Sequence, residues 1–183
     1  MDVNETKREA IEVIGKDYVE NQTCHRRKRD IRNKYQTIAT VVTELFDQIP
    51  VPVVFQKEDP SDDYEHMAKP VAKEHQLRVY SGHASHPVMS DETNLKFRAV
   101  HDWFGHLKYD VDFTTTGEYH KWLSMCGDFP DSTHGVLFAE VVGQLGAIKY
   151  LDDGFGSDRY EQKAIEAPKW WIHKIVRGIN NSY

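Results

Sequence analysis

The chain has 183 residues, of which 39% are hydrophobic and 28% charged, and its formal net charge is -6. This length fits one domain, and the composition is that of a globular protein, which excludes collagen-like, disordered and low-complexity chains. The acidic balance lacks the overall basic footprint of a protein that coats nucleic acid.

Two cysteines, Cys24 and Cys126, are too few for a disulfide framework or a cysteine-rich zinc site, which favours a reducing compartment. The N-terminal sequence has no apolar segment of the signal-peptide kind, and no stretch approaches the roughly 18 consecutive apolar residues of a membrane span. We therefore expect a cytoplasmic protein with no membrane partner.

The first 48 residues predict a pair of helices. Apolar residues recur at helical spacing over about 4–18 and again over about 27–47, and Pro50 ends the second helix. The β-branched run 51–55 predicts a short strand, with 77–80 as its partner.

Residues 63–74, between the two predicted strands, predict a short helix interrupted at Pro70. Asp91 can then cap a helix that runs to about residue 107, and 117–125 can form a short helix.

The last third of the chain predicts two more helical stretches. Ser132 can cap a long helix to about residue 152. A final stretch begins near residue 158 and must kink or restart at Pro168.

No internal repeat or flexible linker divides these elements. The sequence therefore predicts one domain over 1–183, mainly α (α+β), a helical assembly with a small two-stranded β element. Within it, 1–48 form the N-terminal helical pair and 77–166 form the motif-bearing core.

Histidines concentrate in one part of the chain. Six of the ten lie within 83–134, where uniform spacing predicts about 3. We therefore look for chemistry in this stretch, whose histidines are His83, His86, His101, His106, His120 and His134.

On a helical wheel with about 100° per residue, Arg98, His101, Asp102 and His106 form a polar arc beside an apolar one. Asp102 and His106 are four residues apart, so they meet on adjacent turns and can share a cation or a proton. Gly105 inside a helix costs about 1 kcal/mol relative to alanine, which indicates that something approaches the backbone closely there. The alternative is a surface histidine–aspartate pair followed by a histidine at the helix C-terminus. The set as a whole favours a functional site.

Glu140 projects from the apolar stripe of the predicted helix that follows Ser132. A buried carboxylate is costly unless it binds a cation or accepts strong hydrogen bonds. We expect its partner to be the ion held by the histidine and aspartate side chains described above. The alternative pairs Glu140 with a core cation such as Arg98 or Lys163. Gly143 and Gly146 would let another helix pack closely.

Other candidate groups carry weaker signals. His83 and His86 lie in a turn-rich loop and could each add a ligand, although each alone is more often solvated. Glu118 and His120 are candidate acid-base groups. The basic run 25–29 could contact phosphate, but such a run is usually a solvated face, so nucleic-acid binding stays open.

Four blocks of residues resemble a set of bacteriophage and prophage proteins. The resemblance covers about 77–166 and implies a phage origin, and with it the cytoplasm of the host cell, without supplying a reaction. The blocks are His101-Asp102-x-x-Gly105-His106, Gly117-Glu118, Glu140-x-x-Gly143-Gln144 and Gln162-Lys163.

The first block also resembles, more weakly, the HD-domain phosphohydrolases, which are helical enzymes. In those a His-Asp pair binds a divalent metal together with an earlier histidine and a later aspartate. This chain has one extra residue between Asp102 and Gly105. The resemblance favours phosphate chemistry, and it implies an earlier ligand among His75, His83 and His86 and a later one from Asp152 and Asp153.

The sequence thus predicts a metal-dependent hydrolase of phage origin that acts on a small-molecule or phosphate-containing substrate such as a phosphoester or nucleotide. The donor types suit Zn, Mn or Fe(II). The predicted metal ligands are His101, Asp102, His106 and Glu140. The predicted catalytic groups are Glu118 or Glu140 as general base and Arg98 or Lys163 as charge stabilisers, with Gln144, Gln162, His83 and His86 as further site residues.

A second hypothesis is a non-enzymatic phage protein that binds and modulates a host protein. Its contact surfaces would be the basic helix and the pair Trp170-Trp171. The histidine–acid cluster would then be a hydrogen-bonded network in the core.

Overall fold

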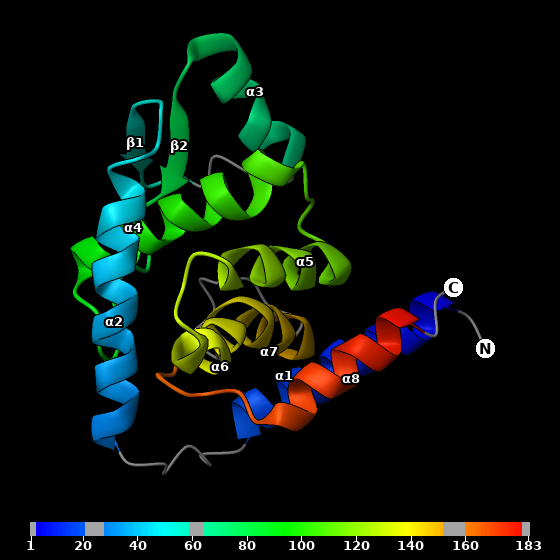
Figure 1. The fold of residues 1–183 in the computed structure, drawn as a ribbon. Helices are drawn as coiled ribbons and strands as arrows, with labels where there is room; N and C mark the ends of the chain where they lie inside the picture. The colour runs from blue at the N-terminus through cyan, green and yellow to red at the C-terminus, as the bar shows by residue number, and fades with distance from the viewer. Residues whose placement is uncertain (1–2, 21–27, 59–63, 152–159, 181–183) are drawn as a thin grey trace.

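The computed structural model describes residues 3–20, 28–58, 64–151 and 160–180. It confirms a mainly α fold with a small two-stranded sheet (Figure 1). The regular helices and strands are α1 (Val3–Glu20), α2 (Lys28–Phe46), β1 (Val53–Gln56), α3 (Tyr64–Glu74), β2 (Leu77–Tyr80), α4 (Asp91–Val100), α5 (Thr115–Cys126), α6 (His134–Phe138), α7 (Gln144–Leu151) and α8 (Lys169–Asn180).

Two segments between these helices are wound as π-helices, which are rare and occur mostly as single turns inside α-helices, often at functional sites. The first, η1 (His101–His106), continues α4, and the second, η4 (Ala139–Gly143), joins α6 to α7. A 3-10 turn, η2 (Leu107–Tyr109), follows η1, and another, η3 (Asp131–Thr133), precedes α6. The long helices predicted here are therefore present, but with a winding that the sequence did not indicate.

The helix α1 packs against both α7 and α8 (Figure 1). A Cβ added at Gly15 would lie 1.9 Å from the carbonyl oxygen of Gly146, so the backbones of α1 and α7 are in contact. The expectation that Gly146 permits close helix packing is confirmed. In α8 Trp171 is buried and its Nε1 donates to Asp17, whereas Trp170 is 43% exposed. Only Trp170 of the pair is therefore available as a contact surface.

The predicted apolar stripe of α2 is buried, as its helical spacing requires. It lines the main core of the described residues, and α2 packs along α4. The buried residues of the stripe are Ile31, Tyr35, Ile38, Val42 and Leu45.

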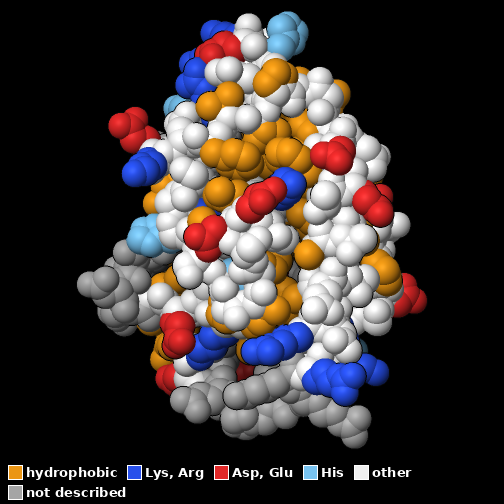
Figure 2. Space-filling view, turned by 90° about the vertical axis from the view of Figure 1, so that its left-hand side faces the viewer, with side chains coloured by type: hydrophobic (Ala, Val, Ile, Leu, Met, Phe, Trp, Pro, Cys, Tyr) orange, Lys and Arg blue, Asp and Glu red, His pale blue; other side chains and the backbone are white. Residues whose placement is uncertain are grey.

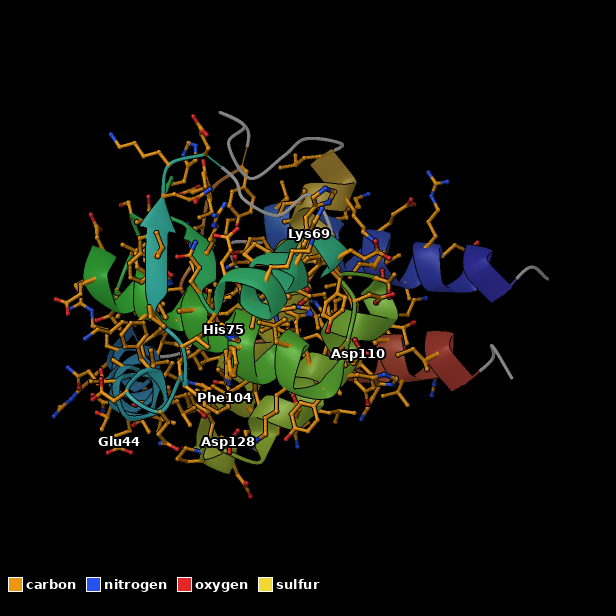
Figure 3. The ribbon with its side chains drawn as sticks, turned by 90° about the horizontal axis from the view of Figure 1, so that it is seen from above. Glu44, Lys69, His75, Phe104, Asp110 and Asp128 are labelled. Atoms are coloured by element: carbon orange, nitrogen blue, oxygen red, sulfur yellow. The ribbon has the colours of Figure 1, made fainter. Side chains whose placement is uncertain are left out.

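The strands β1 and β2 pair in parallel, with Val53 opposite Leu77. Parallel strands need a crossover connection, and α3 lies within it. This helix runs through Pro70 without a break, so the predicted interruption is wrong. Packing of its buried Met67 against the sheet and against Ala99 outweighs the cost of the proline. Figure 3 looks down onto α3, with Lys69 on it and His75 just beyond it, above the helix that carries Phe104.

Hydrophobic side chains also reach the surface. Val54 and Phe55 of β1 are 39% and 37% exposed. In the view of Figure 2, hydrophobic surface gathers in the upper part of the face, between scattered acidic and basic side chains. Among the described helices, none is both long enough and apolar enough to cross a bilayer.

Three predicted helix starts change in the structure. The side chain of Ser90, not Asp91, caps α4 by accepting from the amide of Thr93. The 3-10 turn η3 replaces the predicted cap at Ser132. Residues 160–168 are not helical, and α8 starts after Pro168. Residues 25–27 of the basic run, together with Asp152 and Asp153, lie outside the described residues.

Candidate metal centre

The π-helical turn η1 brings His101 and His106 together. They are five residues apart, which is the hydrogen-bond spacing of a π-helix. Their ring centroids are 4.9 Å apart. The prediction paired Asp102 with His106 on a wheel of regular α geometry. The structure corrects it, because the wider turn aligns the two histidines instead.

His106 is buried, and the contact made by its Nδ1 fixes its tautomer. Nδ1 lies 2.8 Å from the carbonyl oxygen of Val111, which can only accept, so Nδ1 carries the hydrogen. In the neutral ring, Nε2 then presents a lone pair. Nε2 lies 3.2 Å from Oε1 of Glu118 and has no hydrogen-bond partner in the described part of the chain. Two acceptors that face each other in a buried site leave a position for a cation or a proton.

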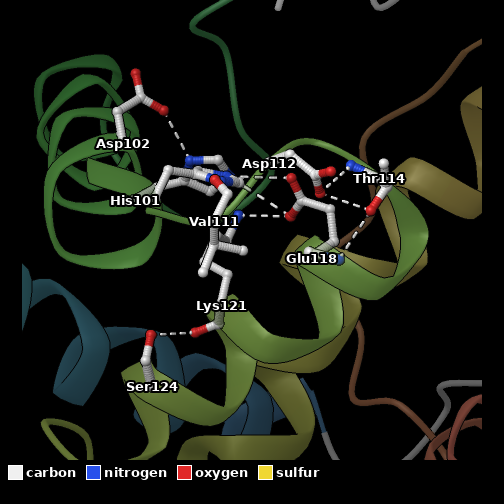
Figure 4. Close-up of polar contacts among 10 residues, drawn as sticks. His101, Asp102, Val111, Asp112, Thr114, Glu118, Lys121 and Ser124 are labelled. Carbon is white, nitrogen blue, oxygen red and sulfur yellow. Dashed lines mark hydrogen bonds and ion pairs between the residues drawn. The ribbon is translucent and has the colours of Figure 1, made fainter. Parts of the chain in front are cut away.

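His101 repeats this arrangement. Its Nδ1 lies 2.8 Å from Oδ1 of Asp102, and its Nε2 lies 3.9 Å from Oε2 of Glu118 (Figure 4). Burial and the charge of Lys121 lower the pKa of His101 to about 4, although Asp102 opposes the shift. The ring is therefore neutral at pH 7, which is the form that binds metals. Asp102 orients this histidine and is not itself one of the converging ligands.

Glu118 reaches the centre from the first turn of α5. Thr114 caps this helix by accepting from the amide of Gly117, and Asp112 holds Thr114 through its amide and its hydroxyl group (Figure 4). The same loop supplies the Val111 carbonyl that orients His106. One loop thus positions two of the three converging side chains.

Lys121, one turn further along α5, is fully buried and donates to Oε2 of Glu118 at 2.7 Å. Burial raises the pKa of the Glu118 carboxyl, but Lys121 and the two imidazoles outweigh that effect and hold the pKa well below its usual range. Burial lowers the pKa of Lys121, against the opposing effect of Glu118. Glu118 is therefore ionised, and one of its oxygens is paired with an ammonium group.

Gly105 makes room for this lysine. A Cβ at Gly105 would lie 2.2 Å from Cγ and 2.6 Å from Cδ of Lys121. The expectation that something approaches the backbone at Gly105 is therefore confirmed. Sequence reasoning did not identify Lys121 itself, although its spacing of three residues from Glu118 on one helix was an available signal.

His101, His106 and Glu118 together could hold a metal ion. Each offers one ligand atom, and all three atoms lie within 4.8 Å of one another. A tetrahedral ion with bonds of about 2.1 Å places its ligand atoms about 3.4 Å apart, so small side-chain rotations would close the group around an ion. The Nδ1 atom of each histidine faces away from this point and donates to its own acceptor, Asp102 for His101 and the Val111 carbonyl for His106. Such an outer hydrogen bond is usual for metal-ligating histidines.

Glu140 belongs to a separate network, which corrects its predicted place among the metal ligands. Its Oε1 accepts from the hydroxyl of Tyr35 and from Nε2 of His86 at 3.3 Å. Its Oε2 accepts from the amides of Gln144 and of Gln162, the latter at 3.1 Å. These four donors occupy the roughly four lone-pair sites of a carboxylate. The network satisfies the buried charge without an ion.

His86 also differs from its predicted role as a ligand. Its Nδ1 accepts from the amides of Val88 and Met89, so the hydrogen is on Nε2, which donates to Glu140. His83 is exposed, with a left-handed backbone at φ 50°, and it lies outside the three-residue group.

The predicted charge stabilisers have structural contacts. The Arg98 guanidinium donates to the backbone carbonyls of Tyr80, Gly82 and His83, and so fastens the loop after β2. The Nζ of Lys163 donates to the carbonyls at 18 and 19, in the last turn of α1. Lys163 is therefore a helix C-terminal contact and does not line the pocket described next, which corrects its predicted catalytic role.

A pocket of about 510 Å³ connects the two networks. Arg98 and His83 line it as well, whereas the buried His106 and Lys121 are not among its lining residues. The residues that the two networks contribute to its lining are His101, Asp102 and Glu118 from the first, and Glu140, Gln144 and Gln162 from the second. The candidate centre thus borders a ligand-sized space through His101 and Glu118.

Comparison with protein-family models, curated proteins and solved structures finds no match to this chain. The resemblances to phage proteins and to HD-domain enzymes therefore stay predictions.

Proposed function

We propose that this protein is a metal-dependent hydrolase whose centre is formed by His101, His106 and Glu118. One observation supports it above the others. Both histidines turn a hydrogen-bearing Nδ1 to an acceptor, so their Nε2 lone pairs converge on a carboxylate. Lone pairs in that orientation leave a position for a cation between them.

The donor set is the two-histidine, one-glutamate set of catalytic zinc sites, which keep a further position for water or substrate. His101, His106 and Glu118 would hold a divalent cation, which would supply an activated water and polarise the bond under attack. Zn, Mn and Fe(II) all accept these donors, and we propose one of them as the cofactor.

The residues around the centre have distinct roles in this proposal. Asp102 faces the pocket and is 19% exposed, so it can both orient His101 and accept a proton from the attacking water. Glu140 cannot act as base, because donors already occupy its lone pairs. Arg78 lines the pocket, and its partly exposed guanidinium, which donates to Glu74 through one nitrogen at 2.6 Å, is a cation that can meet a phosphate-containing substrate. We propose a phosphoester or nucleotide as that substrate, in the cytoplasm of a phage host.

Metal content tests the first part of the proposal. Protein purified metal-free and then supplied with Zn, Mn or Fe(II) is expected to hold about one equivalent by elemental analysis. The His106→Ala variant is expected to lose that metal. The matched control His120→Ala changes an exposed histidine on α5 and is expected to keep it.

Hydrolysis tests the second part. Chromogenic phosphomonoesters and phosphodiesters are the probes, and turnover is expected only in metal-loaded wild-type protein and in the His120→Ala control. Absence of bound metal under every condition would overturn the proposal. Oxygen consumption with Fe(II) in the absence of hydrolysis would replace it with redox chemistry at the same centre.

A further inference from the structure

The pocket holds two glutamine carboxamides that the metal centre does not use. Gln144, the first residue of α7, and Gln162, in the segment before α8, both line the pocket. Each donates from Nε2 to the same oxygen of Glu140. A carboxylate only accepts hydrogen bonds, so this contact fixes which end of each amide faces Glu140. The carbonyl oxygen and the second N–H of each amide are then directed elsewhere.

The anchor for these amides is rigid. The side chain of Glu140 is 1% exposed, and its other oxygen is held by Tyr35 and His86. Burial and the Glu140 charge raise the pKa of Tyr35 well above its ordinary value, so Tyr35 remains a donor. A carboxylate fixed on both oxygens holds two carboxamides in one orientation at the pocket wall.

The rest of this wall includes aromatic side chains. They offer faces and edges on which a flat ring can pack, and the pocket volume of about 510 Å³ is in the range of small-molecule sites. The aromatic lining residues are Phe97, Phe113, Tyr80 and Tyr160.

We propose that Gln144 and Gln162 form a subsite for the lactam edge of a planar heterocycle such as a nucleobase. A lactam presents a carbonyl acceptor beside an N–H donor, and a carboxamide offers the complementary donor and acceptor. Aromatic packing with hydrogen bonds to the base edge is a general mode of recognition for unpaired bases. The inference deepens the proposed function and rests on it, because the heterocycle would be the part of the substrate that the metal centre does not touch.

Nucleoside binding to chelator-treated protein tests the subsite apart from the metal. Uridine and inosine are the probes, and their analogues methylated at the lactam nitrogen, 3-methyluridine and 1-methylinosine, are the matched ligands. Binding of at least one parent nucleoside by titration calorimetry is expected, with a loss of about tenfold or more on methylation. Equal affinity for a parent and its methylated form, or binding of neither, would overturn the subsite.

Two variants assign the contact to the carboxamides. Gln144→Met and Gln162→Met keep the side-chain length and remove the amide, and each is expected to weaken nucleoside binding about tenfold. Gln48→Met, at an exposed glutamine of similar chemistry, is expected to change nothing. The comparison of methylated and parent ligands on wild-type protein remains decisive if either variant fails to fold.

The proposed hydrolase activity and the proposed lactam subsite can be overturned independently of each other. His106→Ala is expected to lose metal and hydrolysis while it keeps nucleoside binding. Metal-dependent hydrolysis with no preference for a lactam would overturn the subsite and leave the hydrolase standing. Lactam-dependent binding in a protein that never takes up metal would leave a nucleoside-binding site and overturn the hydrolase.

Discussion

His101 and His106 have ring centroids 4.9 Å apart although they are five positions apart on one helix. In a regular α-helix, residues five apart point about 140° away from each other. The π-helical winding of this turn removes most of that divergence. It lets both rings face Glu118 on α5, so that the candidate centre depends on the local winding as much as on the residue types.

Gly105→Ala is expected to destabilise the protein and to disturb the centre together. The new Cβ would overlap the stem of buried Lys121, and such overpacking costs about 1–3 kcal/mol. Gly127→Ala is the control, because its nearest neighbour would lie at 3.4 Å and its backbone is already helical. Urea unfolding with metal titration measures both effects, and equal behaviour of the two variants would contradict the close packing at Gly105.

Lys121→Met is expected to destabilise the metal-free protein by about 3–5 kcal/mol, because it leaves a buried carboxylate without its cation. A divalent ion at Glu118 would replace the lost charge. Added Zn or Mn should therefore raise the thermal midpoint of Lys121→Met by more than that of wild type.

Lys149→Met serves as the control for this comparison, since Lys149 donates to Thr115 and not to Glu118. A loss of stability in Lys121→Met that no metal restores would show that Lys121 and Glu118 form only a structural ion pair.

Lys163→Met is expected to lower stability by about 1–3 kcal/mol without changing metal content or turnover, because its ammonium contacts carbonyls in the last turn of α1. Chemical denaturation, elemental analysis and the phosphoester assay on the same preparation separate these effects. A fall in turnover at full stability would restore the catalytic role predicted from the sequence.

Tyr35→Phe removes one donor from the buried carboxylate of Glu140. The expected cost is about 1.5–3 kcal/mol, the range for a hydrogen bond to a charged group. Tyr109→Phe, at a tyrosine 49% exposed, should stay near wild type. Denaturant unfolding of both variants measures this difference in stability. Equal stabilities of the two variants would contradict the role of Glu140 as an anion held by neutral donors.

The fold was largely predictable because its main signals are periodic. The apolar stripe from Ile31 to Leu45 predicts a helix, and the β-branched run at β1 predicts a strand. Both local preferences agree with the packing in the folded protein. The helix through Pro70 was not predictable, because packing of Met67 at a distance in sequence outweighs the local preference of proline.

The residue types of the site were predictable from the sequence, but which side chains contact one another was not. Glu118 replaces Glu140 at the histidines, because the loop before α5 turns this helix toward them, with a left-handed φ of 54° at Asp110 and a helix cap at Thr114. No periodic pattern reports such a turn. Glu140 was correctly inferred to need strong partners, but four neutral donors from distant segments supply what a cation was expected to supply.

The π-helical turns also make the protein sensitive to chain length at two points. Each closes its hydrogen bonds over one residue more than an ordinary helical turn does. Removing a single residue from either turn would return it to the common geometry, in which residues four apart lie on adjacent turns. A one-residue deletion between His101 and His106 would therefore keep the two rings on one face of the helix, whereas a one-residue insertion in either turn would rotate the helix that follows it by about 100°.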